Sequence, residues 1–314
     1  MTDSTFAYLY SRVKTMYFRH RYMMVARKVL TTPPIGIGNM PFILLSMVHH
    51  RDVYSYLVAV KSFVMQANPS RIVVVCDPSI TGSDRIVLKT HIPYIELVSA
   101  NKFTNPDIPH GGCWERLWAI THYVTDMYVV QLDADTITVQ SIPEVVAAIH
   151  GSNGFVLGEE PNQTLLNLSD ASHNAIECIQ YFPHIQTYAE TAMGNIGLSI
   201  TSRYVRGCAG FTGFPRTNKM REQLLDFSTR MSHSMGNKWS TWGTEQVTSN
   251  YLVANAQSTI VLPFPKYGTP DVENIDTSFL HFIGPMRFLN NRYQYISKYS
   301  IQKITYYLND LLHT

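Results

Sequence analysis

Continuous apolar runs, separated by helical patterns, constrain the fold of this chain more than any other feature of its sequence. Such runs lie at 42–48, 71–76 (RIVVVC) and 128–132 (YVVQL), and residues 53–66 and 114–124 have a helical pattern. Strands that are apolar on both sides are typical of a parallel sheet with helices on both faces. We therefore predict an α/β fold with a Rossmann-like, mostly parallel central sheet.

The rest of the chain is less regular but still consists of short strands and helices. We predict further strands at 94–98, 154–158, 209–214 and 260–263, and helices at 143–149, 219–231, 243–253 and the C-terminal end. With 314 residues, 45% of them hydrophobic, the chain is long enough to bury a large core. Ligands of open parallel sheets bind at the carboxyl ends of the strands, which directs attention to Asp77 and Asp133.

The N-terminal segment is strongly basic. Residues 1–32 contain six Lys or Arg and a single acid, and 6–30 predict an amphipathic helix that ends before Pro33-Pro34. We divide the chain into a basic helical segment with its linker, 1–34, and the α/β domain, 35–314. The helix either packs on its own domain or a partner, or makes a peripheral membrane contact through residues 6–30.

Charge and cysteine content limit the class of protein. A formal net charge of +2 gives no indication of a nucleic-acid partner. The four cysteines form no CxxC pair, which favours reduced thiols and a cytoplasmic location. Neither a signal peptide nor an apolar window of about 20 residues is evident. Membrane association through the basic helix is the alternative to a purely cytoplasmic location.

The main chemical signal is the pair Asp133-Ala134-Asp135, which directly follows the apolar run 128–132. In extended backbone, side chains two residues apart point the same way. Two adjacent carboxylates at such a position favour Mg²⁺ or Mn²⁺, and an ion of this kind can neutralise a leaving nucleoside diphosphate. The alternative is a turn in which both Asp side chains cap the next segment.

Three motifs together resemble a known enzyme family. Trp114-Glu115-Arg116-Leu117 precedes the strand, Leu132-Asp133-Ala134-Asp135-Thr136 follows it, and residues 281–287 read HFIGPMR. This combination is similar to glycosyltransferases of the GT-A fold, most of all family 8, the glycogenin and galactosyltransferase group. Residues 35–314 are accordingly expected to form a GT-A domain. The resemblance spans roughly residues 41–290.

The resemblance implies a set of site residues. The metal is held by Asp133, Asp135 and His281, and a histidine ligand suits Mn²⁺ better than Mg²⁺. Arg287 contacts the diphosphate, and Gly284 lets the backbone approach the phosphates. The other expected substrate contacts are Asp52, Ala134 and Tyr54, whose ring would stack on the nucleotide base. The resemblance implies Asp133, Asp135, Arg116 and Glu245 as catalytic residues, with Arg116 reaching the donor sugar or phosphate and Glu245 contacting the donor sugar.

Each of these residues also has an ordinary interpretation. His281 is equally a core histidine before a turn, Tyr54 an exposed residue at a helix start, and Arg116 a surface arginine. Glu245 is equally a first-turn acid favoured by the helix dipole. The family has Asn-x-Gly where this chain has Arg206-Gly207-Cys208, and a thiol lacks the hydrogen-bonding capacity of an amide.

The implied reaction transfers a hexose from a nucleoside-diphosphate sugar, a UDP-sugar by the resemblance, with retention of configuration. The acceptor hydroxyl belongs to a glycan, a lipid-linked glycan or a protein. Two other functions remain open. A nucleotidyltransferase would have a glycine-rich basic loop where residues 47–51 read MVHHR, without glycine. A catalytically inactive protein that binds nucleotide sugars is the other alternative, because the region around Cys208 departs from the family pattern.

Overall fold

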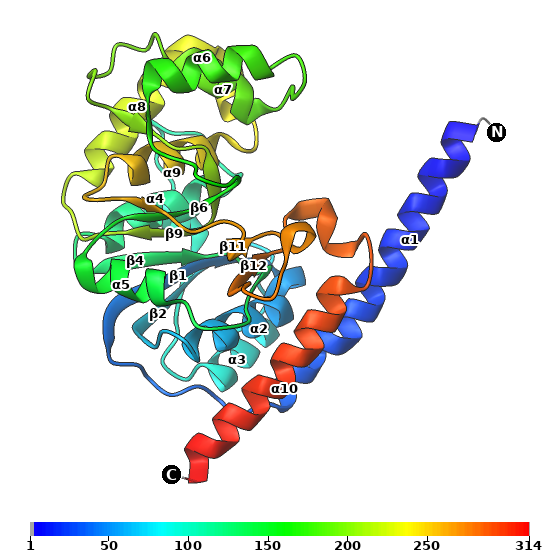
Figure 1. Ribbon diagram of the computed structural model, residues 1–314. Helices are drawn as coiled ribbons and strands as arrows, with labels where there is room; N and C mark the ends of the chain where they lie inside the picture. Colours follow the sequence, from blue (N-terminus) through cyan, green and yellow to red (C-terminus); the bar gives the residue numbers. More distant parts are fainter. Residues whose placement is uncertain (1–2, 314) are drawn as a thin grey trace.

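A seven-stranded sheet forms the centre of the molecule (Figure 1). The computed structural model describes residues 3–313, so residues 1, 2 and 314 of the two predicted segments lie outside the description. In spatial order the strands are β10 (Ile260–Val261), β6 (Phe155–Gly158), β9 (Gly207–Phe214), β4 (Tyr128–Leu132), β1 (Met40–Val48), β2 (Pro69–Cys76) and β3 (Glu96–Ser99). Only β9 runs antiparallel to its neighbours, β4 and β6. The predicted mostly parallel α/β sheet is confirmed.

Both faces of this sheet are buried, as the apolar runs predict. Along β1, Phe42 and Leu44 belong to one apolar core, whereas Ile43 and Leu45 belong to the other. Helices α2 (Val53–Val64), α3 (Gly82–His91), α5 (Pro143–Gly151) and α10 (Arg292–His313) contribute to the first core. Helices α4 (Trp114–Tyr123), α6 (Leu168–Cys178), α7 (Ile185–Met193), α8 (Met220–Met235) and α9 (Thr244–Ala254) contribute to the second.

Two small sheets complete the fold. In the first, β12 (Phe279–His281) lies between β11 (Tyr267–Gly268) and β5 (Thr136–Thr138). The second pairs β7 (Leu166–Asn167) with β8 (Arg203–Tyr204). Short 3₁₀ turns are η1 (Arg27–Thr31), η2 (His50–Asp52), η3 (Ala100–Phe103), η4 (Gly236–Ser240), η5 (Pro270–Val272) and η6 (Gly284–Phe288). The first small sheet matters most, because it connects the end of β4 with the C-terminal part of the chain.

Three helices, α3, α6 and α7, were not predicted from the sequence. Much of α3 is polar, but Thr81 and Asp84 form a capping box at its start, a local signal that could have revealed it. The predicted strand 94–98 begins later, at Glu96, since the backbone N–H of Ile95 still bonds back to Ile92 in a turn.

The predicted N-terminal helix is present as α1 (Asp3–Ala26). Its second half packs on the domain, where Tyr22 is buried and stacks on Tyr293 of α10 with ring centroids 4.0 Å apart. The first half of α1 extends beyond the rest of the body, while its second half lies beside α10 (Figure 1). None of the helices within residues 3–313 combines the length and the apolarity that crossing a membrane requires.

Candidate functional site

The carboxylate pair lies in the turn that connects β4 to β5. The backbone N–H of Asp133 donates to Gly210 O at 2.9 Å, which ties the end of β4 to the antiparallel strand β9. Thr136 Oγ1 donates to Asp133 O at 2.8 Å and closes the turn. Asp133 is partly exposed and Asp135 is buried. The pair therefore sits at the carboxyl end of a central parallel strand, where the sheet topology predicts a ligand site.

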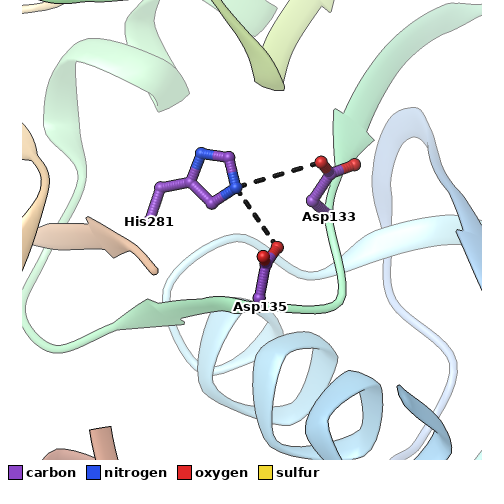
Figure 2. A group of neighbouring side chains, drawn as sticks. All are labelled: Asp133, Asp135 and His281. Carbon is purple, nitrogen blue, oxygen red and sulfur yellow. Dashed lines mark hydrogen bonds and ion pairs between the residues drawn. The ribbon is translucent and has the colours of Figure 1, made fainter. Parts of the chain in front are cut away.

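Pairing between β5 and β12 brings His281 to the carboxylates. The two strands run antiparallel with His281 opposite Thr136, and Phe282 N donates to Asp135 O at 2.9 Å. His281 Nε2 lies 3.2 Å from Asp135 Oδ1 and 3.9 Å from Asp133 Oδ2 (Figure 2). One ligand atom from each of the three residues lies within 4.8 Å of the others. The three residues predicted as metal ligands thus converge.

The other face of the His281 ring lies against β9. Cys208 Sγ is 3.1 Å from His281 Nδ1, and both residues are buried. An imidazole that binds a cation through Nε2 carries its proton on Nδ1 and donates it to a neighbouring acceptor. Cys208 occupies that acceptor position, so its departure from the family pattern places a sulfur behind the histidine. Sequence reasoning missed this contact because the two residues lie 73 positions apart.

Arg287 joins the carboxylates to the end of β1. Its Nη2 lies 2.6 Å from Asp135 Oδ2, and its Nη1 lies 3.1 Å from Asp52 Oδ1. Gly284 begins the turn η6 that carries Arg287, and its φ of 43° is in the left-handed region that favours glycine. The structure therefore brings Asp52, Gly284 and Arg287 to the same side of the carboxylate pair.

A second guanidinium lies on the other side of the pair. Arg116, near the start of α4, is buried and forms an ion pair with Asp133, while its Nη2 lies 3.0 Å from Glu245 Oε1. Burial raises the pKa of Glu245, and the positive charge of Arg116 opposes this rise. Arg116 is therefore not the surface arginine that we considered as the alternative, whereas Glu245 does lie in the first turn of α9, as its alternative interpretation had it. The ion pair with Glu245 holds the guanidinium of Arg116 in place, and Arg116 in turn holds the carboxylate of Asp133.

The charges of this cluster fit a divalent cation. Four carboxylates (Asp52, Asp133, Asp135, Glu245) form ion pairs with three guanidiniums (Arg51, Arg116, Arg287), which leaves one negative charge when His281 is neutral. Burial by itself would raise the pKa of Asp135, but when His281 is protonated instead, its positive charge and that of Arg287 outweigh the effect of burial and keep that pKa low. Oxygen and imidazole ligands together suit Mn²⁺ or a similar hard cation.

Two residues predicted to contact the donor, Ala134 and Tyr54, pack on the apolar core next to the site. Ala134 is buried between the two carboxylates and belongs to the apolar core beneath them. Tyr54, in the first turn of α2, packs partly on the same core, and the guanidinium of Arg27 lies 5.7 Å from its ring centroid. Asp77, at the end of β2, pairs with His49 at 3.2 Å and is outside the metal group. Stacking of Tyr54 on a base stays a prediction.

No protein-family model matches this sequence, and no curated protein matches it either. Solved structures do share the fold. The bifunctional glycosyltransferase WbbM, in its apo form, superposes with a TM-score of 0.51 and 11% identity, over 86% of this chain and 52% of WbbM. The glycosyltransferase GlyE of Streptococcus pneumoniae TIGR4 gives 0.51 and 12% identity, over 88% of this chain and 64% of GlyE.

These likenesses define the fold as that of the GT-A glycosyltransferases. This chain spans about half the length of WbbM and less than two thirds of GlyE. At such low identity the likeness concerns the architecture, and function has to be argued from the site. The resemblance to family 8 continues to rest on the three motifs alone.

Proposed function

We propose that this protein is a metal-dependent glycosyltransferase that transfers a hexose from a nucleoside-diphosphate sugar to an acceptor hydroxyl. The observation that carries the proposal is the convergence of Asp133, Asp135 and His281, with ligand atoms within 4.8 Å of one another, at the carboxyl end of β4. We further propose Mn²⁺ as the cation and a UDP-sugar as the donor. We also propose that the chain divides into a helical segment, 1–34, and a catalytic domain, 35–314.

Each side chain has a role in this proposal. Bound between Asp133, Asp135 and His281, the cation would supply positive charge for the leaving diphosphate. Arg287 binds the diphosphate from the side of Asp52, and its fork of N–H donors can hold two phosphate oxygens at once. Arg116, fixed by Glu245, orients Asp133 and faces the sugar side. Catalysis then rests on positioning and electrostatic stabilisation.

The direct test is hydrolysis of UDP-, GDP- and ADP-sugars by the purified protein with Mn²⁺, with and without EDTA. We expect release of one nucleoside diphosphate that EDTA abolishes. Asp135→Asn should lose this release and retain the circular dichroism spectrum of the wild type. Metal-dependent release that survives in Asp135→Asn would overturn the assignment of the site.

The same assay separates the alternatives. A nucleotidyltransferase would release pyrophosphate from a nucleoside triphosphate in the presence of a sugar phosphate, and an inactive binding protein would bind the nucleotide without turnover. We also propose retention of configuration, as the family resemblance implies. Nuclear magnetic resonance of the first product formed would show it, because axial and equatorial anomeric protons have different couplings.

The acceptor is a glycan, a lipid-linked glycan or a protein, and an exposed apolar face of α1 favours the lipid-linked class. Leu9, Val13, Met16, Tyr17 and Met24 lie on one helical face and are 48–67% exposed. The Phe6 side chain lies outside the side chains that the structure describes. Basic residues (Arg12, Lys14, Arg21) flank this face, an arrangement that suits the surface of an anionic membrane.

We therefore propose a peripheral membrane contact through residues 6–30. The test is co-flotation of the full-length protein with anionic vesicles that contain phosphatidylglycerol. Vesicles of phosphatidylcholine alone, which have no net charge, are the control. Replacing Val13, Met16 and Tyr17 together by Ser should reduce flotation with the anionic vesicles and leave nucleotide-sugar hydrolysis unchanged. Equal flotation of the variant and the wild type would contradict the contact.

A further inference from the structure

A cavity of about 230 Å³ lies beside Arg287, the arginine that contacts Asp135 of the metal group. Three separate segments form its walls. Arg19 and Tyr22 come from α1, Arg51 and Asp52 from η2, and Gly284 and Arg287 from η6. Arg287 lines the cavity and also contacts the metal ligand Asp135 at 2.6 Å. Arg287 therefore links the wall of this cavity to the carboxylate pair.

Positive charge exceeds negative charge in the wall of this cavity. Asp52 lies between two guanidiniums, with Oδ2 3.3 Å from Arg51 Nε and Oδ1 3.1 Å from Arg287 Nη1. Arg19 is exposed and forms no ion pair with an acid among the side chains that the structure describes. Three guanidiniums and one carboxylate make the cavity suited to an anion with several oxygens.

The position of Arg19 is fixed by the packing of α1 on the domain. Tyr22 lies one helical turn after Arg19, is 1% exposed, and its hydroxyl donates to Ser55 Oγ at 2.9 Å. Its ring stacks on Tyr293 and also lies 5.5 Å from the ring of Phe288 in η6. Because Tyr22 is anchored to α2, α10 and η6 together, the adjoining turn of α1 is held over the cavity.

We propose that this cavity is a phosphate subsite of the donor, in which Arg19 and Arg51 bind the diphosphate together with Arg287. The N-terminal helix then forms one wall of the donor site, in addition to making the proposed membrane contact. This inference rests on the proposed function for the identity of the donor. We choose phosphate as the bound group because guanidiniums outnumber carboxylates in the wall of the cavity.

The test measures binding of inorganic pyrophosphate and of UDP, GDP and ADP by calorimetry, with the full-length protein and excess Mn²⁺. Arg19→Gln and Arg51→Gln should each weaken pyrophosphate binding about tenfold, since each removes a charged donor to phosphate. Arg21→Gln is the matched control, because Arg21 is on the same helix but contacts Tyr17 at 3.0 Å away from the cavity. Its affinity should stay within about twofold of the wild type.

The outcomes separate this inference from the proposed function. Pyrophosphate affinity that is equal in Arg19→Gln and Arg21→Gln overturns the subsite, even where the wild type hydrolyses a nucleotide sugar. Arg19-dependent pyrophosphate binding without any hydrolysis supports the subsite and contradicts the proposed enzyme. In a parallel arm, vesicles of phosphatidylglycerol replace pyrophosphate. Dependence on Arg19 for vesicles but not for pyrophosphate would assign the cavity to a lipid headgroup and overturn the donor subsite.

Discussion

The imidazole of His281 lies directly over the α-carbon of Gly210. A Cβ built on Gly210 would lie 2.1 Å from His281 Cε1 and 2.6 Å from Nδ1, distances that real structures do not allow. Glycine at this position of β9 therefore makes room for the third member of the metal group. The neighbouring residue on the same side of the strand, Cys208, contacts the same ring.

Gly210→Ala should displace His281 and weaken Mn²⁺ binding about 10- to 100-fold, because supports of a ligating histidine have effects of this size. Electron paramagnetic resonance of free Mn²⁺ measures the affinity. Gly36→Ala is the control, since a Cβ there meets nothing within 4 Å. Equal Mn²⁺ affinity in the two variants would show that His281 does not bind the cation.

Cys208→Ala should also weaken Mn²⁺ binding, by about tenfold, because Nδ1 of His281 would lose its contact with sulfur inside the protein. Cys208→Ser restores a polar atom that can accept the Nδ1 proton, so it should recover most of the affinity. The same resonance titration measures all three proteins. If the Ala and Ser variants bind Mn²⁺ equally, the sulfur has no role in orienting the ring.

The pair Arg116–Glu245 should behave as a coupled buried ion pair. Arg116→Met leaves Glu245 buried without its partner, and we expect a loss of about 3–5 kcal/mol in the free energy of unfolding. Arg116→Met combined with Glu245→Leu should be less destabilised than Arg116→Met alone, since no unpaired charge stays buried at Glu245. Urea unfolding of the two single variants and the double variant measures the coupling. Additive losses would contradict it.

His91 makes stability depend on pH below neutrality. Burial, with a smaller contribution from the charge of Lys61 at 3.1 Å, lowers the pKa of His91 from 6.5 to about 4. Between these values the unfolded chain takes up a proton that the folded protein does not. The free energy of unfolding should therefore fall as pH drops from 6.5 to about 4, by at most about 3 kcal/mol from this group.

Urea unfolding at several pH values checks this prediction. The variant His91→Asn lacks the titrating group, so its stability should fall less over the same range. Lowered pKa values of Asp77 and Asp84 also reduce stability in acid, but they do so in both proteins and cancel in the difference. Parallel profiles for the wild type and the variant would show that His91 titrates normally in the folded protein.

Local sequence pattern was sufficient for the sheet and for the carboxylate pair. Buried strands such as Tyr128–Leu132 were predictable because an apolar run of this length, bounded by turns, has few other structures. Asp133 and Asp135 were predictable as a candidate ligand pair because the topology of parallel sheets brings their strand end to the place where ligands bind. Both inferences depend only on neighbours in the chain and on a general rule of sheet architecture.

Only the tertiary structure decided how distant residues complete the site. Arg116 meets Glu245 across 129 positions, and Cys208 meets His281 across 73. Arg19 reaches the cavity that Arg287 lines because Tyr22 packs against α10, at the other end of the chain. Such contacts depend on strand register and on how helices close over the sheet. The physical reason is that residues far apart in the chain meet through packing, which the periodicity of any single segment does not encode.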